Sequence, residues 1–344
     1  MSSSVKISRR GLFFGLAASA LTASDAEARA RRWVLERLIL PEPAWIAVDP
    51  ISGKEFDGQN ADELRRPASI AKLMTIYLAF DAIRSGDLPL DEALPISEIA
   101  ARQGNFKLPY GDTPVTAELL IKAAGAFSCN SAATELAMRI LKREPVLRRE
   151  EAFAALMTYT AQQKLGMPKT VLKKASGWPV PGQVTTAREI SKLAPAVYEH
   201  FQDDVYRQLL CFQSFELNGK SYFRHDYLMY QGNTGERNEA IKVAKTGQQS
   251  FQGAVAVLKR GERRKKVPAH ETERNMAIYA ENGTQRVSVV VLGAPNQGFR
   301  LSKTNRLIET GFREGRCHEF EMMGFDVTPR DYNCPARSTP ALIM

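Results

Sequence analysis

Three short motifs contain residue types that support nucleophilic catalysis, and the first is Ser69-Ile-Ala-Lys72. If this stretch is helical, its spacing of three places both side chains on one face, within hydrogen-bonding reach. A serine hydroxyl is a poor nucleophile until a base takes its proton, and an unprotonated lysine is such a base. The spacing therefore predicts Ser69 as a nucleophile and Lys72 as its general base.

The surroundings of this motif favour the same chemistry. Apolar residues of the predicted helix would favour the uncharged amine of Lys72. Because Ser69 is near the start of that helix, its backbone N–H is suited to binding an oxyanion. Taken alone, however, Ser-x-x-Lys occurs often by chance.

The second and third motifs supply groups that could relay a proton and bind a substrate. In Ser128-Cys-Asn130, the hydroxyl can pass a proton to a leaving group and the amide can hold a substrate amide. Lys245-Thr246-Gly247 is predicted to end a strand, where a cation and a hydroxyl can bind a carboxylate. Its glycine lets the backbone come close to a ligand. A polar helix junction and an ordinary strand-to-turn exit are the alternative interpretations.

The elements that must position these motifs can be read from apolar periodicity. Helices are predicted in the middle of the chain, at about 68–85, 117–127, 131–141, 150–165 and 186–200. Strands are predicted toward both ends, at 44–49, 54–57, 239–245, 254–258, 276–281 and 287–293. Asn282-Gly283 indicates a hairpin, and a helix over 302–310 is expected to end before Gly311. We therefore expect a mixed α/β fold, with one sheet built from both termini and a helical region inserted.

Composition excludes several classes of protein. The chain has 344 residues, of which 44% are hydrophobic, 25% charged and 8% aromatic, as in ordinary globular proteins. Wholesale disorder, a collagen-like fibre and a small disulfide scaffold are therefore excluded. No apolar run reaches the ~18 residues of a membrane-spanning helix, which excludes a multispanning protein. The formal net charge of +9 is too small for a dedicated nucleic-acid binder and suits an anionic partner such as a cell-wall polymer.

Residues 1–30 are predicted to be a removable export signal. A positive start with Arg9 and Arg10 precedes a short apolar run and a small-residue stretch with Ala-x-Ala. The sequence around the two arginines is similar to a bacterial twin-arginine signal. An uncleaved anchor is the alternative, but the apolar run is too short to span a bilayer core of ~30 Å. We therefore expect export to the periplasm or cell-wall compartment with cleavage of the signal.

The cysteines do not form a metal or redox motif. None of Cys129, Cys211, Cys317 and Cys334 is part of a Cys-x-x-Cys pair. In an oxidising compartment Cys317 and Cys334 could bridge and hold the C-terminal tail, stabilising it by roughly 3 kcal/mol. A tail with free thiols is the alternative.

Taken together and in this order, the three motifs resemble the signature of the penicillin-recognising serine enzymes. The flanks are similar to those of the D-alanyl-D-alanine carboxypeptidases, the low-molecular-weight penicillin-binding proteins. The resemblance covers about residues 40–315. The matching segments are Trp45–Asp49, Gly53-Lys54, Arg66–Thr75, Gly111, Thr116–Leu120, Pro181-Gly182, Thr185–Arg188, Val289–Gly293 and Gly311-Phe312. The resemblance implies a penicillin-binding/β-lactamase-like fold, with an antiparallel sheet and helices on its faces.

The same resemblance implies a role for the residues of the first two motifs. Ser69 would be the acylated nucleophile and Lys72 its general base. Ser128 would act in proton relay, and Asn130 would position the substrate.

For the third motif, the resemblance implies that Lys245 and Thr246 hold the terminal carboxylate of the substrate. Arg300, twelve residues before Phe312, is similar to a family arginine that also meets this carboxylate. Gly247 allows close approach of the substrate. Backbone N–H groups of Ser69 and Gln248 would form the oxyanion hole.

The implied activity is removal of the terminal D-alanine from peptidoglycan stem peptides through a Ser69 acyl-enzyme, with β-lactams as covalent inhibitors. No metal or cofactor and no nucleic-acid partner is implied. The implied domains are a signal at 1–30, a catalytic domain at 31–315 and a tail at 316–344. Three alternatives remain: a DD-endopeptidase that cuts cross-links, a non-catalytic penicillin-binding wall protein, and a β-lactamase. The last is disfavoured because no Glu-x-x-Leu-Asn segment lies between the second and third motifs.

The chain departs from the family pattern at several positions. Cys129-Asn130-Ser131 stands where Gly-Asn-Asp is usual, and Gln248 stands where His or Tyr is frequent. Cys129 is expected to be a small buried residue, with an oxidation-sensitive site as the alternative.

The family strand after Lys-Thr-Gly matches better at 276–281 than at 254–258. This predicts an insertion around 250–273 that carries the basic run 259–266, either a solvated loop or a site for an anionic polymer. About thirty residues follow Gly311-Phe312, so we expect no second domain and no membrane anchor in the mature chain.

Overall fold

The computed structural model describes residues 42–103, 112–199, 209, 214–223, 230–231, 236–237, 241–250, 272–282 and 285–322. Only the main chain is described at 199, 214, 223, 230–231, 236–237, 241–250, 272–273, 282 and 317–322. The predicted signal segment, the strand predicted at 254–258, the basic run and the tail beyond 322 lie outside these ranges. The Cys317–Cys334 bridge and the role of the insertion therefore stay predictions.

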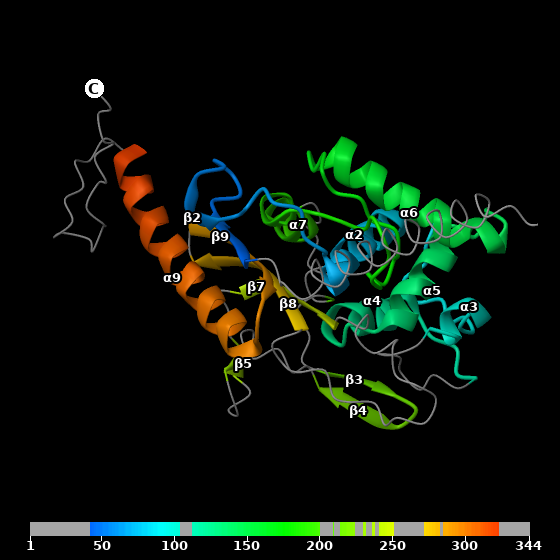
Figure 1. The fold of residues 1–344 in the computed structure, drawn as a ribbon. Coiled ribbons are helices and arrows are strands. Elements are labelled where there is room, and N and C mark those ends of the chain that lie inside the picture. Colours follow the sequence, from blue (N-terminus) through cyan, green and yellow to red (C-terminus); the bar gives the residue numbers. More distant parts are fainter. Residues whose placement is uncertain are drawn as a thin grey trace, which may run out of the picture.

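A five-stranded antiparallel sheet forms the centre of the fold, in the order β2-β1-β9-β8-β7. Its strands are β1 (Ala44–Val48), β2 (Glu55–Gln59), β7 (Ile241–Ser250), β8 (Thr272–Asn282) and β9 (Gln285–Ala294). β1 pairs with β9, so that Ile46 lies opposite Val290. This pairing confirms the prediction of one sheet built from both ends of the chain (Figure 1).

Helices cover both faces of the sheet. Along β9, Val287, Val289 and Val291 belong to the apolar cluster beneath α9 (Gln297–Met322). Val290 and Leu292 alternate with them and join the larger core, with α7 (Ala187–Glu199) and α2 (Lys72–Arg84). Because side chains alternate across a strand, the continuous apolar run of β9 fits a strand that is buried on both faces. Figure 1 shows α9 on one side of the sheet and α7 and α2 on the other.

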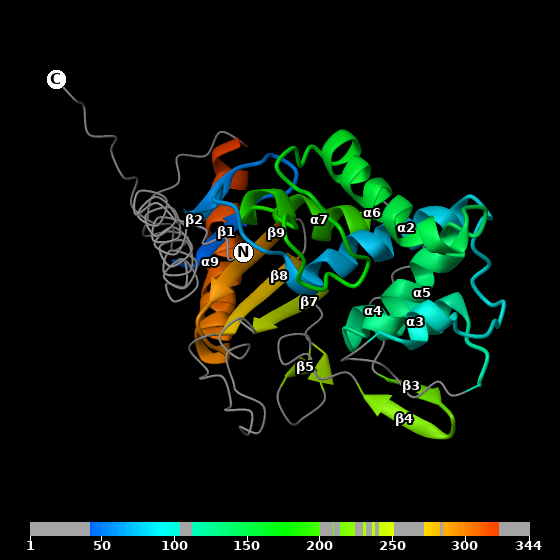
Figure 2. The ribbon, with the colours of Figure 1, turned by 45° about the vertical axis from the view of Figure 1, so that its right-hand side comes forward.

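A helical region lies beside the sheet, as predicted (Figure 2). Arg139 is buried there and pairs with Glu135 one turn away on the same helix at 2.9 Å. It fixes the neighbouring segments through the main-chain carbonyls of Leu94 and Val115, both at 2.9 Å. The region comprises α3 (Glu98–Ala101), α4 (Ala117–Ala126), α5 (Asn130–Ile140), η2 (Val146–Arg148), α6 (Arg149–Tyr159) and the π-helical turn η3 (Thr160–Lys164).

The third motif lies inside a strand, which corrects the prediction that it ends one. β7 continues past Lys245-Thr246-Gly247 to Ser250, because β8 begins early enough to pair with it over this whole length. Gly247 lies opposite Asn275 in this ladder. The prediction that the partner strand follows an insertion, near 276–281, is confirmed by the pairing of β7 with β8.

The last helix also differs from the prediction. It does not end before Gly311 but runs from Gln297 to Met322. A Cβ atom at position 311 would lie 2.3 Å from Cγ2 of Val287, so the glycine is needed for close packing of α9 on β9. A glycine inside a helix thus serves helix–sheet contact here, whereas the sequence suggested a C-terminal cap.

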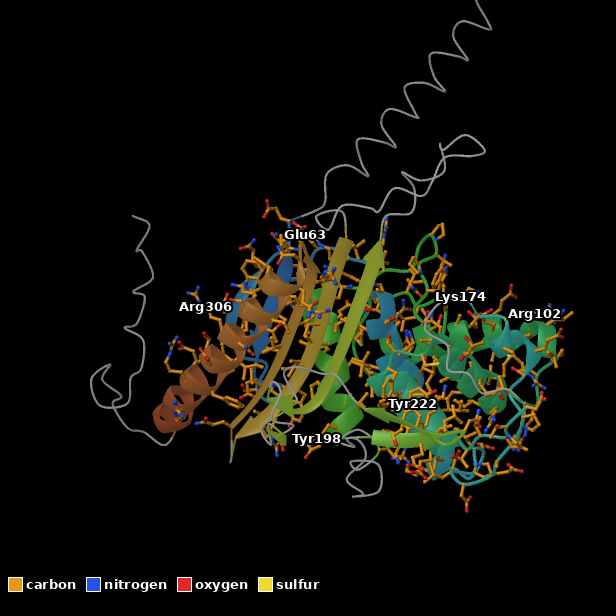
Figure 3. All side chains as sticks on the ribbon, turned by 90° about the horizontal axis from the view of Figure 1, so that it is seen from below. Glu63, Arg102, Lys174, Tyr198, Tyr222 and Arg306 are labelled. Atoms are coloured by element: carbon orange, nitrogen blue, oxygen red, sulfur yellow. The ribbon has the colours of Figure 1, made fainter. Side chains whose placement is uncertain are left out.

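A second small sheet, the hairpin of β3 (Ser214–Leu217) and β4 (Lys220–Phe223), was missed by the sequence analysis. Its turn is Asn218-Gly219, with φ of 52° and 69°, a dipeptide that is a strong hairpin signal. The hairpin packs on the end of α4: the ring of Phe215 meets Phe127 edge-on with centroids 5.2 Å apart, and Tyr222 stacks on Phe215 at 5.3 Å. Figure 3 shows Tyr222 on the side of the hairpin that meets the helical region. A further two-residue pair joins β5 (Tyr230–Gln231) to β6 (Glu236–Arg237).

Candidate active site

Ser69 and Lys72 lie at the start of the first long helix, within hydrogen-bonding distance of each other. Ser69 is in the 3-10 turn η1 (Ala68–Ala71), and Lys72 is the first residue of α2. Lys72 Nζ lies 3.0 Å from Ser69 Oγ. Lys72 is fully buried, whereas Ser69 is half-buried. A substrate arriving from solvent would therefore meet the hydroxyl first, with the amine beneath it.

The second motif joins α4 to α5 and turns two of its side chains toward the same amine. Lys72 Nζ lies 3.4 Å from Ser128 Oγ and 2.8 Å from Asn130 Oδ1. Ser128 has a φ of 54°, in the left-handed region that costs a non-glycine residue roughly 1–2 kcal/mol. Cys129 turns the other way and is buried in the core, where its Sγ lies 3.2 Å from Ser131 Oγ. This burial supports the expectation that Cys129 is a small core residue.

A third chain segment contacts both Lys72 and the turn that carries Ser69, and the sequence did not predict it. The main-chain carbonyl of Ser176 accepts from Lys72 Nζ at 2.6 Å, and the carbonyl of Ala175 accepts from Thr75 Oγ1 at 2.7 Å. Gly177 follows, with a φ of 70°, and packs so tightly that a Cβ atom there would lie 2.0 Å from the carbonyl oxygen of Ala68. Every residue type has a main-chain carbonyl, so the sequence gives no signal that this loop contacts Lys72.

Ala68, directly before the nucleophile, is itself in the left-handed region with a φ of 48°. Such a conformation persists only when the surrounding structure holds it. Gly177 packs against its carbonyl on one side, and the strands β7 and β8 lie against η1 on another. Ser69, the predicted nucleophile, is therefore carried on a strained turn that is held by several elements.

The third motif reaches this region through the main chain of β7. In the ladder with β8, the pairs are Lys245 with Ala277, Thr246 with Met276, Gly247 with Asn275 and Gln248 with Arg274. Because β7 lies against η1, the strand that carries this motif runs beside the turn that carries Ser69. The structure thus places the motif next to the nucleophile, and the roles of its side chains stay predictions.

Arg300 lies in the first part of α9 and is buried, with 8% of its surface exposed. Its Nη1 lies 3.5 Å from the main-chain carbonyl of Asn275, on the strand adjacent to β7. The structure therefore brings this arginine to β8 at the level of Gly247. Its contact with a substrate carboxylate stays a prediction.

The arrangement around Lys72 determines which way its amine can be oriented. The amide oxygen of Asn130 and the carbonyl of Ser176 can only accept hydrogen bonds. An uncharged amine has two hydrogens and one lone pair. When both hydrogens point to these two acceptors, the lone pair is left for the hydroxyl hydrogen of Ser69. The described groups therefore suit transfer of a proton from Ser69 to Lys72.

Curated relatives of this chain are carboxypeptidases of bacteria. D-alanyl-D-alanine carboxypeptidase DacC of Escherichia coli K12 is 27% identical over 280 residues, which cover 78% of this chain and 61% of the relative. DacF of Bacillus subtilis is 24% identical over 275 residues, covering 79% and 62%. The chain thus spans about three fifths of the length of these relatives.

Solved structures show the same fold. Penicillin-binding protein D2 of Listeria monocytogenes in its cefotaxime-bound form has a TM-score of 0.60 at 23% identity, over 78% of this chain and 96% of that one. Penicillin-binding protein 5 of Haemophilus influenzae has a TM-score of 0.63 at 20% identity, over 78% and 70%. These similarities confirm the predicted penicillin-binding fold.

A family model shows where the chain belongs. The model for D-alanyl-D-alanine carboxypeptidases matches residues 40–296, which include all three motifs and both edges of the sheet. The match confirms the family suggested by the motifs, and the chain belongs to the D-alanyl-D-alanine carboxypeptidase family.

Proposed function

We propose that the chain is a serine DD-carboxypeptidase, which removes the terminal D-alanine from peptidoglycan stem peptides and is inhibited by β-lactams. The observation that carries this proposal is the position of Lys72 Nζ, 3.0 Å from Ser69 Oγ, with Asn130 Oδ1 and the carbonyl of Ser176 as its two obligate acceptors. Family membership and the carboxypeptidase names of the relatives support it.

The reaction follows from this geometry in two stages. Ser69 Oγ attacks the carbonyl carbon of the penultimate D-alanine while its proton passes to Lys72 Nζ. The carbon–nitrogen bond then breaks, and the proton on Lys72 passes through the hydroxyl of Ser128 to the leaving amine of the terminal D-alanine, so that Lys72 is uncharged again. In the second stage a water molecule gives a proton to Lys72 while its oxygen attacks the carbonyl carbon of the ester. The ester carbon–oxygen bond to Ser69 then breaks, and Ser69 Oγ takes the proton back from Lys72. No net proton is consumed, and the products are the shortened peptide and D-alanine.

The groups that bind the substrate are proposed from the third motif and the last helix. Lys245, Thr246 and Arg300 would hold the terminal carboxylate, and this contact distinguishes a carboxypeptidase substrate from an internal peptide. Backbone N–H groups of Ser69 and Gln248 would stabilise the oxyanion of the tetrahedral intermediate. The position of β7 against η1 supports both assignments.

We propose that the enzyme acts outside the cytoplasm, after cleavage of the signal at 1–30. The catalytic domain would be 31–315, followed by the tail at 316–344, and α9 crosses the boundary between them. Within the described ranges, none of the helices combines the length and apolar character that a bilayer span requires. The full chain has a net charge of +9, which is compatible with an anionic partner such as a cell-wall polymer.

The experiment that tests this function is a muropeptide digest. Purified protein would be incubated with pentapeptide monomers and with cross-linked dimers, and the products would be identified by mass, with Ser69→Ala as the control. We expect the monomers to lose one alanine with the wild-type protein and to stay intact with the variant.

Loss of dimers alone would show an endopeptidase instead. Unchanged monomers and dimers, with penicillin still bound covalently, would show a penicillin-binding protein without this turnover. Rapid hydrolysis of penicillin would show a β-lactamase.

A further inference from the structure

Asn275 lies at an irregularity in the sheet, close to the nucleophile. The residue is buried in β8, with 1% of its surface exposed. Between β8 and β9, Arg274 pairs with Ala294 but Met276 pairs with Val291. Two residues of β9 therefore oppose Asn275 alone, which is the geometry of a β-bulge.

The side chain of Asn275 uses both ends of its amide at this bulge. Its Oδ1 accepts from the backbone N–H of Gly293 at 2.8 Å. Its Nδ2 donates to the carbonyls of Arg66 at 2.9 Å and Pro67 at 3.3 Å, three and two residues before Ser69. The Pro67 carbonyl also accepts from the backbone N–H of Ile70 at 3.2 Å and so closes the η1 turn. One buried side chain thus ties the sheet to the main chain that leads into the nucleophile.

The main chain of Asn275 faces the third motif. In the ladder between β7 and β8, Asn275 lies opposite Gly247. Its carbonyl oxygen is the atom that Arg300 Nη1 approaches at 3.5 Å. The residue therefore stands between the turn that carries Ser69 and the strand and helix that carry the predicted carboxylate-binding groups.

We propose that Asn275 is a positioning residue for acylation, which fixes the turn of Ser69 relative to the sheet. This inference rests on the proposed function of Ser69. The turn needs support because Ala68 has a φ of 48°, and Asn275 bonds to the main chain just before this residue, whereas Gly177 meets its carbonyl. An amide is the group that fits, because it accepts from Gly293 with one end and donates to two carbonyls with the other. A displacement of the nucleophile by about 1 Å costs on the order of 100-fold in rate.

Asn275→Asp is the informative variant. The carboxylate keeps an acceptor for Gly293 but replaces the Nδ2 donor with an oxygen that faces the carbonyls of Arg66 and Pro67. The test follows acylation by a fluorescent penicillin at increasing concentrations, which separates the non-covalent dissociation constant from the rate constant of the covalent step. We expect the covalent step to slow roughly 10- to 100-fold, with the dissociation constant unchanged within about twofold. Asn275→Ala, which buries no charge, serves as the second variant and should show the same split.

Ser288→Ala is the matched control. Ser288 is a buried residue of β9 whose Oγ donates to the carbonyl of Ser191 at 2.6 Å, so the variant loses a buried hydrogen bond of the same sheet without touching η1. Its melting temperature should fall while its acylation stays at the wild-type rate. The proposal is overturned if either Asn275 variant acylates as fast as the wild type, or if Ser288→Ala slows the covalent step equally. A wild-type protein that is not acylated at all would instead refute the proposed function itself.

Discussion

Lys72 Nζ donates to the main-chain carbonyl of Ser176 at 2.6 Å, across 104 residues of sequence. This contact holds the base by a loop that contains none of the three motifs. Together with Asn130 Oδ1 at 2.8 Å, the carbonyl takes up the hydrogens of an uncharged amine and turns its lone pair toward Ser69. Two acceptors, one on α5 and one in the loop at Ser176, thus orient the amine of Lys72.

Replacement of this base is the first prediction. Lys72→Met keeps most of the buried side-chain volume but removes the proton acceptor. A general base contributes about 10²–10⁴-fold to rate, so we expect the acylation rate by a fluorescent penicillin to fall by that amount. Lys122→Met on α4, where the half-buried lysine pairs with Glu118, is the control and should acylate normally. Acylation of Lys72→Met at the wild-type rate would remove Lys72 from the role of base.

The loop at Gly177 should be intolerant of a side chain. In Gly177→Ala the new Cβ would meet the carbonyl oxygen of Ala68 at 2.0 Å, so the nucleophile turn must move. Gly53→Ala is the matched control, because Gly53 has a similar φ of 73° but no atom within 4 Å of a new Cβ. Both variants lose roughly 1–2 kcal/mol from the left-handed conformation. We expect Gly177→Ala alone to lose more stability than this in thermal unfolding, and its acylation rate to fall by more than about tenfold. Equal behaviour of the two variants would show that the contact with Ala68 has no consequence.

The third motif predicts recognition of a free carboxylate. The wild-type enzyme should cleave a peptide that ends in D-alanyl-D-alanine much faster than the same peptide with a C-terminal amide. Loss of the proposed charge pair with the substrate in Lys245→Ala should raise the free-energy barrier for the free acid by about 2–4 kcal/mol, which lowers kcat/KM roughly 30- to 700-fold. The amide peptide should be affected little, so the preference for the acid should disappear. If Lys245→Ala retains the preference, Lys245 does not bind the carboxylate.

Two glycines of α9 should respond to alanine with opposite signs. Gly311→Ala places a Cβ atom 2.3 Å from Val287 Cγ2, and we expect a loss of about 1–3 kcal/mol from overpacking. At Gly315 the nearest atom, Phe56 Cζ, is 3.8 Å away, an ordinary contact. Gly315→Ala should therefore gain about 0.5–1 kcal/mol from helix propensity. Thermal unfolding of both variants checks this, and a stabilised Gly311→Ala protein would contradict the packing of α9 on β9.

The parts of the site that could be predicted are those determined by local spacing. Ser69 and Lys72 meet because a spacing of three residues, from the turn η1 into α2, brings their side chains together. The sheet from both termini was predictable because β1 and β9 are apolar segments at opposite ends of the chain. The motifs, taken together, also indicated that Ser128 and Asn130 approach Lys72, although no local pattern places them there.

The parts that could not be predicted depend on main-chain groups and on contacts distant in sequence. The carbonyl of Ser176 is a main-chain acceptor for Lys72 Nζ, and the amide of Asn275 bonds to main-chain groups, so residue type gives no sign of these contacts. The end of β7 was placed wrongly because the length of a strand depends on its partner, and β8 lies beyond a long insertion. The hairpin at Asn218-Gly219 was different, since its turn signal was present in the sequence and was overlooked.

The proposed function requires that Ser69 is acylated, and peptide mapping of the penicillin adduct shows which residue carries the acyl group. Purified wild-type and Ser69→Ala proteins would be treated with a β-lactam. Their intact masses would be measured by mass spectrometry, and the adduct would then be located in a proteolytic digest. We predict one adduct per wild-type chain, on the peptide that carries Ser69, and none on the variant. The melting temperature of the variant should be nearly unchanged because Ser69 is only half-buried. An adduct on another residue, or a labelled Ser69→Ala protein, would contradict the acylation of Ser69.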